Sequence, residues 1–101
     1  MRWLGIDGGG TKTAFCVFDE GMRPAGEPVR LGTCHFAQVG YDGMREVLGQ
    51  GIERCASLGL LGNEWGVGLG LAGFGQEADV RARIRSCVSE LLGQVAPGRP
   101  F

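Results

Sequence analysis

Near the start of the chain, three consecutive glycines separate two short apolar runs, and this arrangement constrains the fold more than any other feature. The segment is Leu4-Gly5-Ile6-Asp7-Gly8-Gly9-Gly10-Thr11-Lys12-Thr13. Trp3–Ile6 precedes the glycines, and Ala14–Phe18 follows them with β-branched and aromatic residues and no helical period. Runs of this kind favour strands. The sequence therefore predicts two strands joined by a glycine-rich turn.

The chemical groups around this turn suit the binding of phosphate. Glycines let backbone N–H groups approach an anion closely, and successive N–H groups form an anion-binding concavity. Asp7 offers the oxygen ligands that Mg²⁺ prefers, while Lys12 offers a positive charge. The predicted phosphate-binding residues are Gly8, Gly9, Gly10, Thr11 and Lys12. The alternative is a tight hairpin turn next to an incidental acid.

The composition argues against several classes of protein. At 101 residues the chain is one small domain or a piece of a larger protein. Its net charge of −1 comes from charges of mixed sign, so no broad basic surface indicates nucleic-acid binding. No apolar run approaches the length that crosses a membrane.

The cysteines indicate reduced thiols. Cys16, Cys34, Cys55 and Cys87 lack the C-x-x-C spacing of zinc and redox sites. The first residues do not resemble a signal peptide. We therefore expect mostly buried, reduced cysteines in a cytoplasmic protein.

Hydrophobic periodicity predicts two more strands and two helices after the glycine turn. The predicted strands are Glu27–Thr33 and Trp65–Ala72, and the predicted helices are Tyr41–Leu58 and Glu77–Leu92. Within the first helix, Gly49 and Gly51 each cost about 1 kcal/mol relative to alanine, or else they allow close packing on the sheet. Gly59 and Gly62 suit the end of that helix.

The resulting order, βββαβα, predicts an α/β fold with a mixed sheet whose first three strands are antiparallel. Residues 1–92 are expected to form one incomplete lobe, followed by an irregular tail at 93–101 that contains two prolines. Because a helix after a strand normally leads to another strand, we expect this lobe to be part of a longer parent. Alone, it would leave a sheet edge and a helix face uncovered.

Two other glycine-rich motifs fit less well. A P-loop needs G-x-x-x-x-G-K-[ST] before a helix, whereas here Thr11 separates Gly10 from Lys12 and a strand follows. A dinucleotide fingerprint, G-x-G-x-x-G, does match Gly68–Gly73 literally. Its first two glycines lie inside the predicted strand, however, and no second strand with an acid follows about twenty residues later. The favoured interpretation is a hairpin that itself holds the phosphates.

The segment Gly5-Ile6-Asp7-Gly8-Gly9-Gly10-Thr11-Lys12-Thr13 resembles the phosphate-1 motif of the actin-like ATPase and sugar-kinase fold. More narrowly, it resembles the opening of the BadF/BadG/BcrA/BcrD ATPase family, which includes N-acetylglucosamine and glucosamine kinases. A second segment, Gly68-Leu69-Gly70-Leu71-Ala72-Gly73-Phe74-Gly75, is similar to the G-L-A-G strand end of that family. The resemblance covers residues 1–92 and implies a partial ribonuclease H-like lobe.

The resemblance implies the N-terminal part of a kinase that transfers the γ-phosphate of MgATP to N-acetylglucosamine, glucosamine or a related hexose. Asp7 would help to hold Mg²⁺ through water, and the glycine turn would hold the β- and γ-phosphates. Sugar contacts would come from His35, in the place of a family asparagine, and from Gly73 and Gln76. A structural or solvated histidine is the alternative for His35. The expected partners are the nucleotide and the sugar, with a homodimer of the full-length parent as an option.

The family's general-base aspartate lies after the second helix, whereas no acidic residue follows Leu92. We therefore expect that aspartate beyond residue 101, no catalytic residue within the chain, and no phosphoryl transfer by the chain alone. Two other functions remain open. One is an ATPase activator of a 2-hydroxyacyl-CoA dehydratase or benzoyl-CoA reductase, which would need paired cysteines for an iron–sulfur cluster. The other is a non-catalytic nucleotide- or sugar-binding module.

Overall fold

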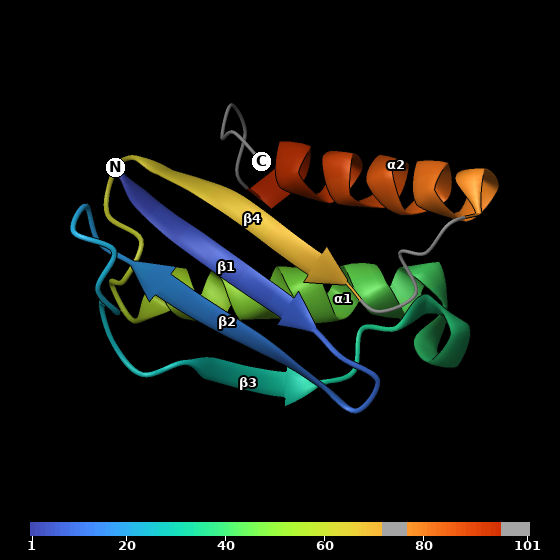
Figure 1. Cartoon of the computed structure of the whole chain (residues 1–101), viewed down its shortest axis with the longest axis horizontal. Coiled ribbons are helices and arrows are strands. Elements are labelled where there is room, and N and C mark those ends of the chain that lie inside the picture. The colour runs from blue at the N-terminus through green and yellow to red at the C-terminus, as the bar shows by residue number, and fades with distance from the viewer. Residues whose placement is uncertain (72–76, 96–101) are drawn as a thin grey trace.

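Two helices pack beside a mixed four-stranded sheet, which makes the chain an α/β protein (Figure 1). The computed structural model describes residues 1–71 and 77–95. In chain order, the elements are β1 (Arg2–Gly8), β2 (Lys12–Phe18), β3 (Val29–Gly32), α1 (Phe36–Ser57), β4 (Trp65–Leu71) and α2 (Ala78–Val95). The predicted order of strands and helices is confirmed.

The pairing of the strands brings the end of β1, the start of β2 and the end of β4 together at one end of the sheet. The strand order is β3-β2-β1-β4. The first three strands pair in antiparallel fashion, as predicted, and β4 joins the other side of β1 in parallel. Gly8 lies opposite Thr13 on one side and Leu71 on the other. The glycine turn therefore stands next to the end of β4.

The core lies between the sheet and α1, because alternate residues of the strands point to the face that this helix covers. Leu4, Phe15 and Val67 are at most 2% exposed on that face. The residues that α1 buries include Met44, Leu48, Ile52 and Cys55. The α2 helix packs against α1 in the same layer. The opposite face of the sheet carries Asp7, which is exposed, and is left uncovered by the helices (Figure 1).

The first helix begins earlier than the predicted Tyr41. A short helical segment starts at Phe36, and Gly40 then interrupts it with φ 75° and ψ 173°. This backbone conformation is accessible essentially only to glycine. The regular part of α1 follows the kink, so the predicted start coincides with the residue after Gly40. Hydrophobic periodicity identified the regular part and missed the segment before it.

Glycine ends α1 in the predicted place. Gly59 has φ 72°, and its N–H donates to the Ala56 carbonyl at 3.0 Å. The Leu60 N–H donates to the Cys55 carbonyl at 3.1 Å. This pair of bonds is the Schellman motif, which satisfies carbonyls that the end of a helix leaves without partners.

The second helix is longer than predicted, and the predicted tail is wrong for its first residues. Gly93, Gln94 and Val95 continue α2, because Val95 packs on the core one turn after Leu91. Residues 96–101 lie outside the described part of the chain.

The third strand is shorter than predicted and begins at Val29, since Pro28 has no N–H to donate to a ladder. Neither helix of the described residues is long and apolar enough to span a membrane.

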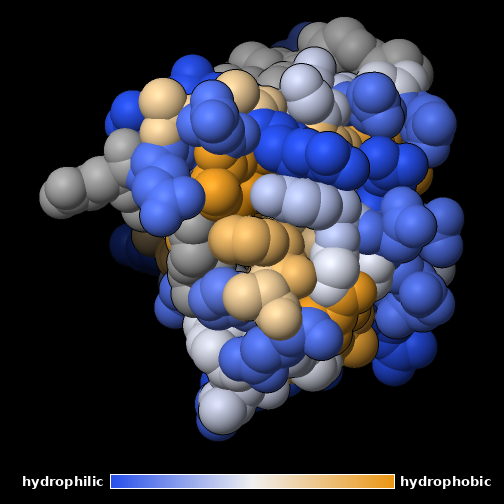
Figure 2. Space-filling view, turned by 90° about the vertical axis from the view of Figure 1, so that its right-hand side faces the viewer, coloured by the Kyte–Doolittle hydropathy of each residue, from blue (hydrophilic) through white to orange (hydrophobic). Residues whose placement is uncertain are grey.

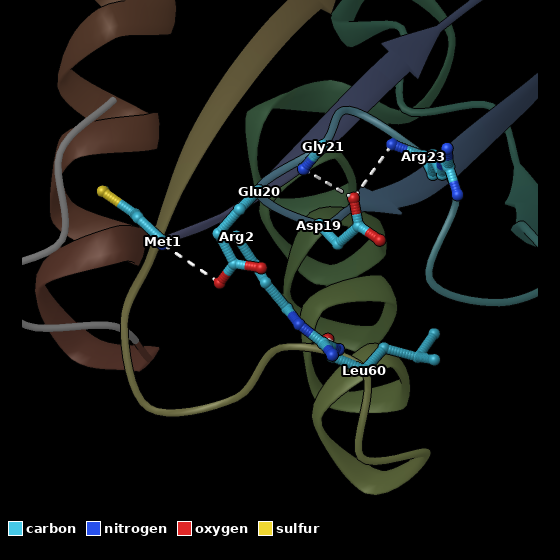
Figure 3. A network of polar contacts seen from close by, with 7 residues as sticks. All are labelled: Met1, Arg2, Asp19, Glu20, Gly21, Arg23 and Leu60. Carbon is cyan, nitrogen blue, oxygen red and sulfur yellow. Dashed lines mark hydrogen bonds and ion pairs between the residues drawn. The ribbon is translucent and has the colours of Figure 1, made fainter.

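Polar contacts join the N-terminus to two turns at the end of the sheet opposite the glycine turn (Figure 3). The Met1 ammonium group lies 3.2 Å from a carboxylate oxygen of Glu20. The Arg2 guanidinium group donates to the Leu60 carbonyl. The Asp19 carboxylate accepts backbone N–H bonds of 2.9 and 3.1 Å within its own turn. The contacts of Met1 and Arg2 hold the start of β1, and the glycine turn follows the other end of the same strand.

Candidate functional site

The glycine turn is a short hairpin between β1 and β2. The Gly9 N–H donates to the Lys12 carbonyl at 2.9 Å, which closes the turn. Gly10 and Thr11 form the tip, and both are exposed. The predicted phosphate-binding residues therefore lie in one hairpin, with Gly8 at the end of β1 and Lys12 at the start of β2.

Packing explains two of the three glycines of the turn, Gly8 and Gly9. Positive φ is confined to Gly40, Gly59 and Gly62 among the described glycines, so the hairpin does not use left-handed glycine backbone. A Cβ on Gly8 would lie 2.7 Å from the Cys34 sulfur, so packing excludes a side chain there. A Cβ on Gly9 would lie 3.3 Å from the Lys12 carbonyl oxygen, which is tight.

Gly10 has no such reason within the described residues. Its φ is not positive, and the nearest atom to a Cβ built on it is Gln38 Nε2 at 3.9 Å. Neither the backbone nor the packing of the described residues requires glycine at the tip. A missing side chain at this point does, however, let an external group approach the backbone closely.

Two side chains that no sequence motif marked hold the hairpin, one from the β3–α1 connection and one from the first turn of α1. The Thr33 hydroxyl donates to the Gly9 carbonyl at 2.9 Å, and Gln38 Nε2 donates to the Gly10 carbonyl at 2.8 Å. Thr13 is fully buried and donates to the Gly32 carbonyl at 2.9 Å, which is a structural role. No sequence motif marks Thr33 or Gln38, because their positions depend on how β3 meets the hairpin.

Asp7 stands on the helix-free face of the sheet, between Ala14 of β2 and Gly70 of β4. Among the described residues, no atom lies within 4 Å of a Cβ built on Gly70, the neighbour of Asp7 on this face. The Asp7 carboxylate has no hydrogen bond or ion pair within residues 1–71 and 77–95. Lys12 occupies the same face two residues before Ala14 and forms no ion pair with Asp7.

A single carboxylate suits Mg²⁺ only as part of a larger ligand set, because this ion is commonly bound through one or two carboxylates together with substrate phosphates and waters. The described residues contain no group of three or more His, Cys, Asp or Glu side chains that could hold a metal ion by themselves. The role of Asp7 in holding Mg²⁺ therefore stays a prediction, and it needs a ligand that brings further oxygen atoms.

The structure gives His35 a structural role as the N-cap of α1. Its Nδ1 accepts the Ala37 N–H at 3.1 Å, and its ring stacks on Phe36 with centroids 5.3 Å apart. Phe36 stacks in turn on Tyr41 at 5.2 Å, and the Arg83 guanidinium lies 4.6 Å from the Tyr41 centroid. Its position between Thr33 and Gln38 places His35 on the segment that is bonded to the hairpin. Its role in sugar binding stays a prediction.

The other predicted sugar contacts, Gly73 and Gln76, lie outside the described residues.

Figure 2 faces the end of the molecule where α1 and α2 begin, and it shows exposed apolar side chains surrounded by hydrophilic ones. A recess of about 700 Å³ lies elsewhere, between β4 and α2, and its lining includes Val67, Leu69 and Ile84. This recess is mainly apolar and contains none of the predicted phosphate-binding residues. We therefore place the candidate site at the hairpin.

No family model and no curated protein matches the chain.

Proposed function

We propose that the hairpin binds the terminal phosphates of MgATP and that the fold is a partial ribonuclease H-like lobe of the actin-like ATPase type. The observation that carries the proposal is Gly10, a glycine with an open, exposed position and no structural reason among the described residues. The antiparallel β1–β3 meander with β4 added in parallel to β1 supports the fold assignment.

Each residue of the hairpin has a distinct part in this proposal. Backbone N–H groups at Gly10 and Thr11 donate to phosphate oxygens, and Lys12 neutralises their charge. Asp7 holds Mg²⁺ through water. The bound ion supplies charge neutralisation and orientation of the phosphates, on which phosphoryl transfer mainly depends.

We further propose that the hairpin belongs to an ATP-dependent sugar kinase that acts on N-acetylglucosamine, glucosamine or a related hexose. The resemblance to the BadF/BadG/BcrA/BcrD family supports this substrate class. The placement of His35 on the segment bonded to the hairpin also supports it, because a sugar bound there would lie beside the phosphates. The imidazole can donate and accept hydrogen bonds to sugar hydroxyls.

Isothermal titration calorimetry of the chain with MgATP, Mg-pyrophosphate and AMP tests the phosphate site. We expect MgATP and pyrophosphate to bind and AMP, which lacks the terminal phosphates, to bind least. Lys12→Met is expected to weaken pyrophosphate binding about tenfold. Arg54→Met removes an exposed charge from the last turn of α1 and should change nothing. Equal affinity for AMP and pyrophosphate would contradict the proposal.

A further inference from the structure

Two peptide groups at the tip of the hairpin are fixed by side chains that are distant in the sequence. Thr33 and Gln38 are separated from the carbonyls that they bind by 24 and 28 positions. The Thr33 hydroxyl is itself oriented, because it also accepts the His35 N–H at 3.1 Å. The Gln38 backbone is fixed by a 2.9 Å bond from its N–H to the His35 carbonyl.

The two carbonyl contacts also fix the directions of two N–H groups, because of the geometry of the peptide bond. The C=O of one residue and the N–H of the next belong to one planar trans unit and point in opposite directions. Because Thr33 holds the Gly9 carbonyl, the Gly10 N–H points away from Thr33. Because Gln38 holds the Gly10 carbonyl, the Thr11 N–H points away from Gln38. Neither N–H has a hydrogen-bond partner in the described part of the chain.

We propose that Thr33 and Gln38 are positioning residues that orient the Gly10 and Thr11 N–H groups for a phosphate anion. The inference rests on the proposed function, since the anion is the terminal phosphate portion of a nucleotide. Two adjacent N–H groups held outward form an anion-binding concavity without any rearrangement on binding. The side chains touch the phosphate only through the backbone that they orient.

The two residues differ in how far they also support the fold. The Thr33 bond is partly buried, so its removal also affects stability. The Gln38 bond is exposed, and its side chain lies on the surface at the start of α1. Gln38→Met keeps the size of the side chain and removes its donor, which makes it the cleaner test. Gln50→Met is the matched control, because Gln50 is also an exposed glutamine of α1 and its side chain bonds Glu46, at 3.4 Å, away from the hairpin.

The test is an NMR titration of the ¹⁵N-labelled chain with inorganic pyrophosphate. In the wild type, the Gly10 and Thr11 amide protons should move downfield. Gln38→Met should abolish mainly the Thr11 shift and weaken binding about five- to tenfold, while the midpoint of urea unfolding stays unchanged. Thr33→Val should abolish mainly the Gly10 shift, and Thr33→Ser, which retains the hydroxyl, should restore it.

The free protein provides a second readout that needs no ligand. Loss of each side-chain donor should move the carbonyl ¹³C resonance of its own acceptor, Gly10 for Gln38→Met and Gly9 for Thr33→Val. Unchanged carbonyl resonances, or equal pyrophosphate affinity in Gln38→Met and Gln50→Met, overturn the positioning role. If the wild-type chain binds no pyrophosphate, the proposed function is wrong. The proposal that the oriented N–H groups bind a phosphate anion is then wrong as well.

Discussion

The ring of Phe15 occupies the space in which a side chain on Gly51 would stand. A Cβ built on Gly51 would lie 2.0 Å from Phe15 Cζ, and the ring is 1% exposed. The helix α1 can therefore approach β2 only because residue 51 has no side chain. This contact sets the distance between the helix and the sheet that carries the hairpin.

Gly51→Ala should destabilise the chain by about 3 kcal/mol, because the buried ring has no free space into which it can move. Urea unfolding measures this change as a lower transition midpoint. Gly49→Ala is the matched control in the same helix, since its Cβ would make an ordinary 3.5 Å contact with Leu91. That variant should gain up to about 1 kcal/mol from helix propensity. Equal stability of the two variants would show that the ring is not fixed in this position.

Gly10→Ala should weaken pyrophosphate binding without lowering stability. The added methyl group stands in open space within the described structure, so the free energy of unfolding stays the same or rises by up to about 1 kcal/mol. It also stands where the phosphate approaches the backbone. Calorimetric titration and urea unfolding of the same preparation measure the two effects.

Gly59→Ala is the control for Gly10→Ala, because it should lower stability and leave pyrophosphate binding unchanged. Gly59 has φ 72°, which costs a residue with a side chain about 1–2 kcal/mol, and it lies at the far end of α1 from the hairpin. Stability should fall and pyrophosphate affinity should not change. If Gly10→Ala also lowers stability and leaves pyrophosphate affinity unchanged, Gly10 serves the fold and not the binding of phosphate.

The sequence was sufficient to predict the elements and the location of the hairpin, because these depend on local patterns. Periodicity located both helices but missed the segment before Gly40 and the last residues of α2. The predicted strand after the glycines distinguished a hairpin from a P-loop. Gly51 could be suspected of close packing, but its contact with Phe15 required the sheet register. Thr33 and Gln38 could not be found, since their bonds depend on where β3 and α1 place them.

Cys55 should resist alkylation much longer than Cys16. Burial raises the pKa of the Cys55 thiol, and the nearby Cys16 adds a smaller effect in the same direction. A raised pKa leaves less of the reactive thiolate at a given pH. Cys16 is only partly buried, on the face of the sheet that the helices do not cover. Mass spectrometry after timed iodoacetamide treatment at pH 8 should find Cys16 labelled first, and denaturing urea should remove the difference. Early labelling of Cys55 in the folded chain would contradict its burial.

Glu20 should titrate below its ordinary pKa of 4.5 in the folded chain. Its own backbone N–H bonds the carboxylate, and the Met1 ammonium group adds a hydrogen bond and a favourable charge, all of which lower the pKa. Because the folded-state pKa is the lower one, the stabilisation is present above 4.5 and is lost as the pH falls through the folded-state value. Side-chain ¹³C resonances followed against pH measure the titration.

Acetylation of the N-terminus separates the two contributions to the Glu20 pKa. It removes the ammonium charge and leaves the backbone N–H of Glu20 in place, so the pKa should rise partway towards 4.5. Since the backbone bond is the largest single cause and is not affected, the acetylated chain should keep part of the lowering. High salt should act in the same direction as acetylation, because it screens the exposed charge pair. A Glu20 pKa that acetylation leaves unchanged would show that the Met1–Glu20 contact does not persist in solution.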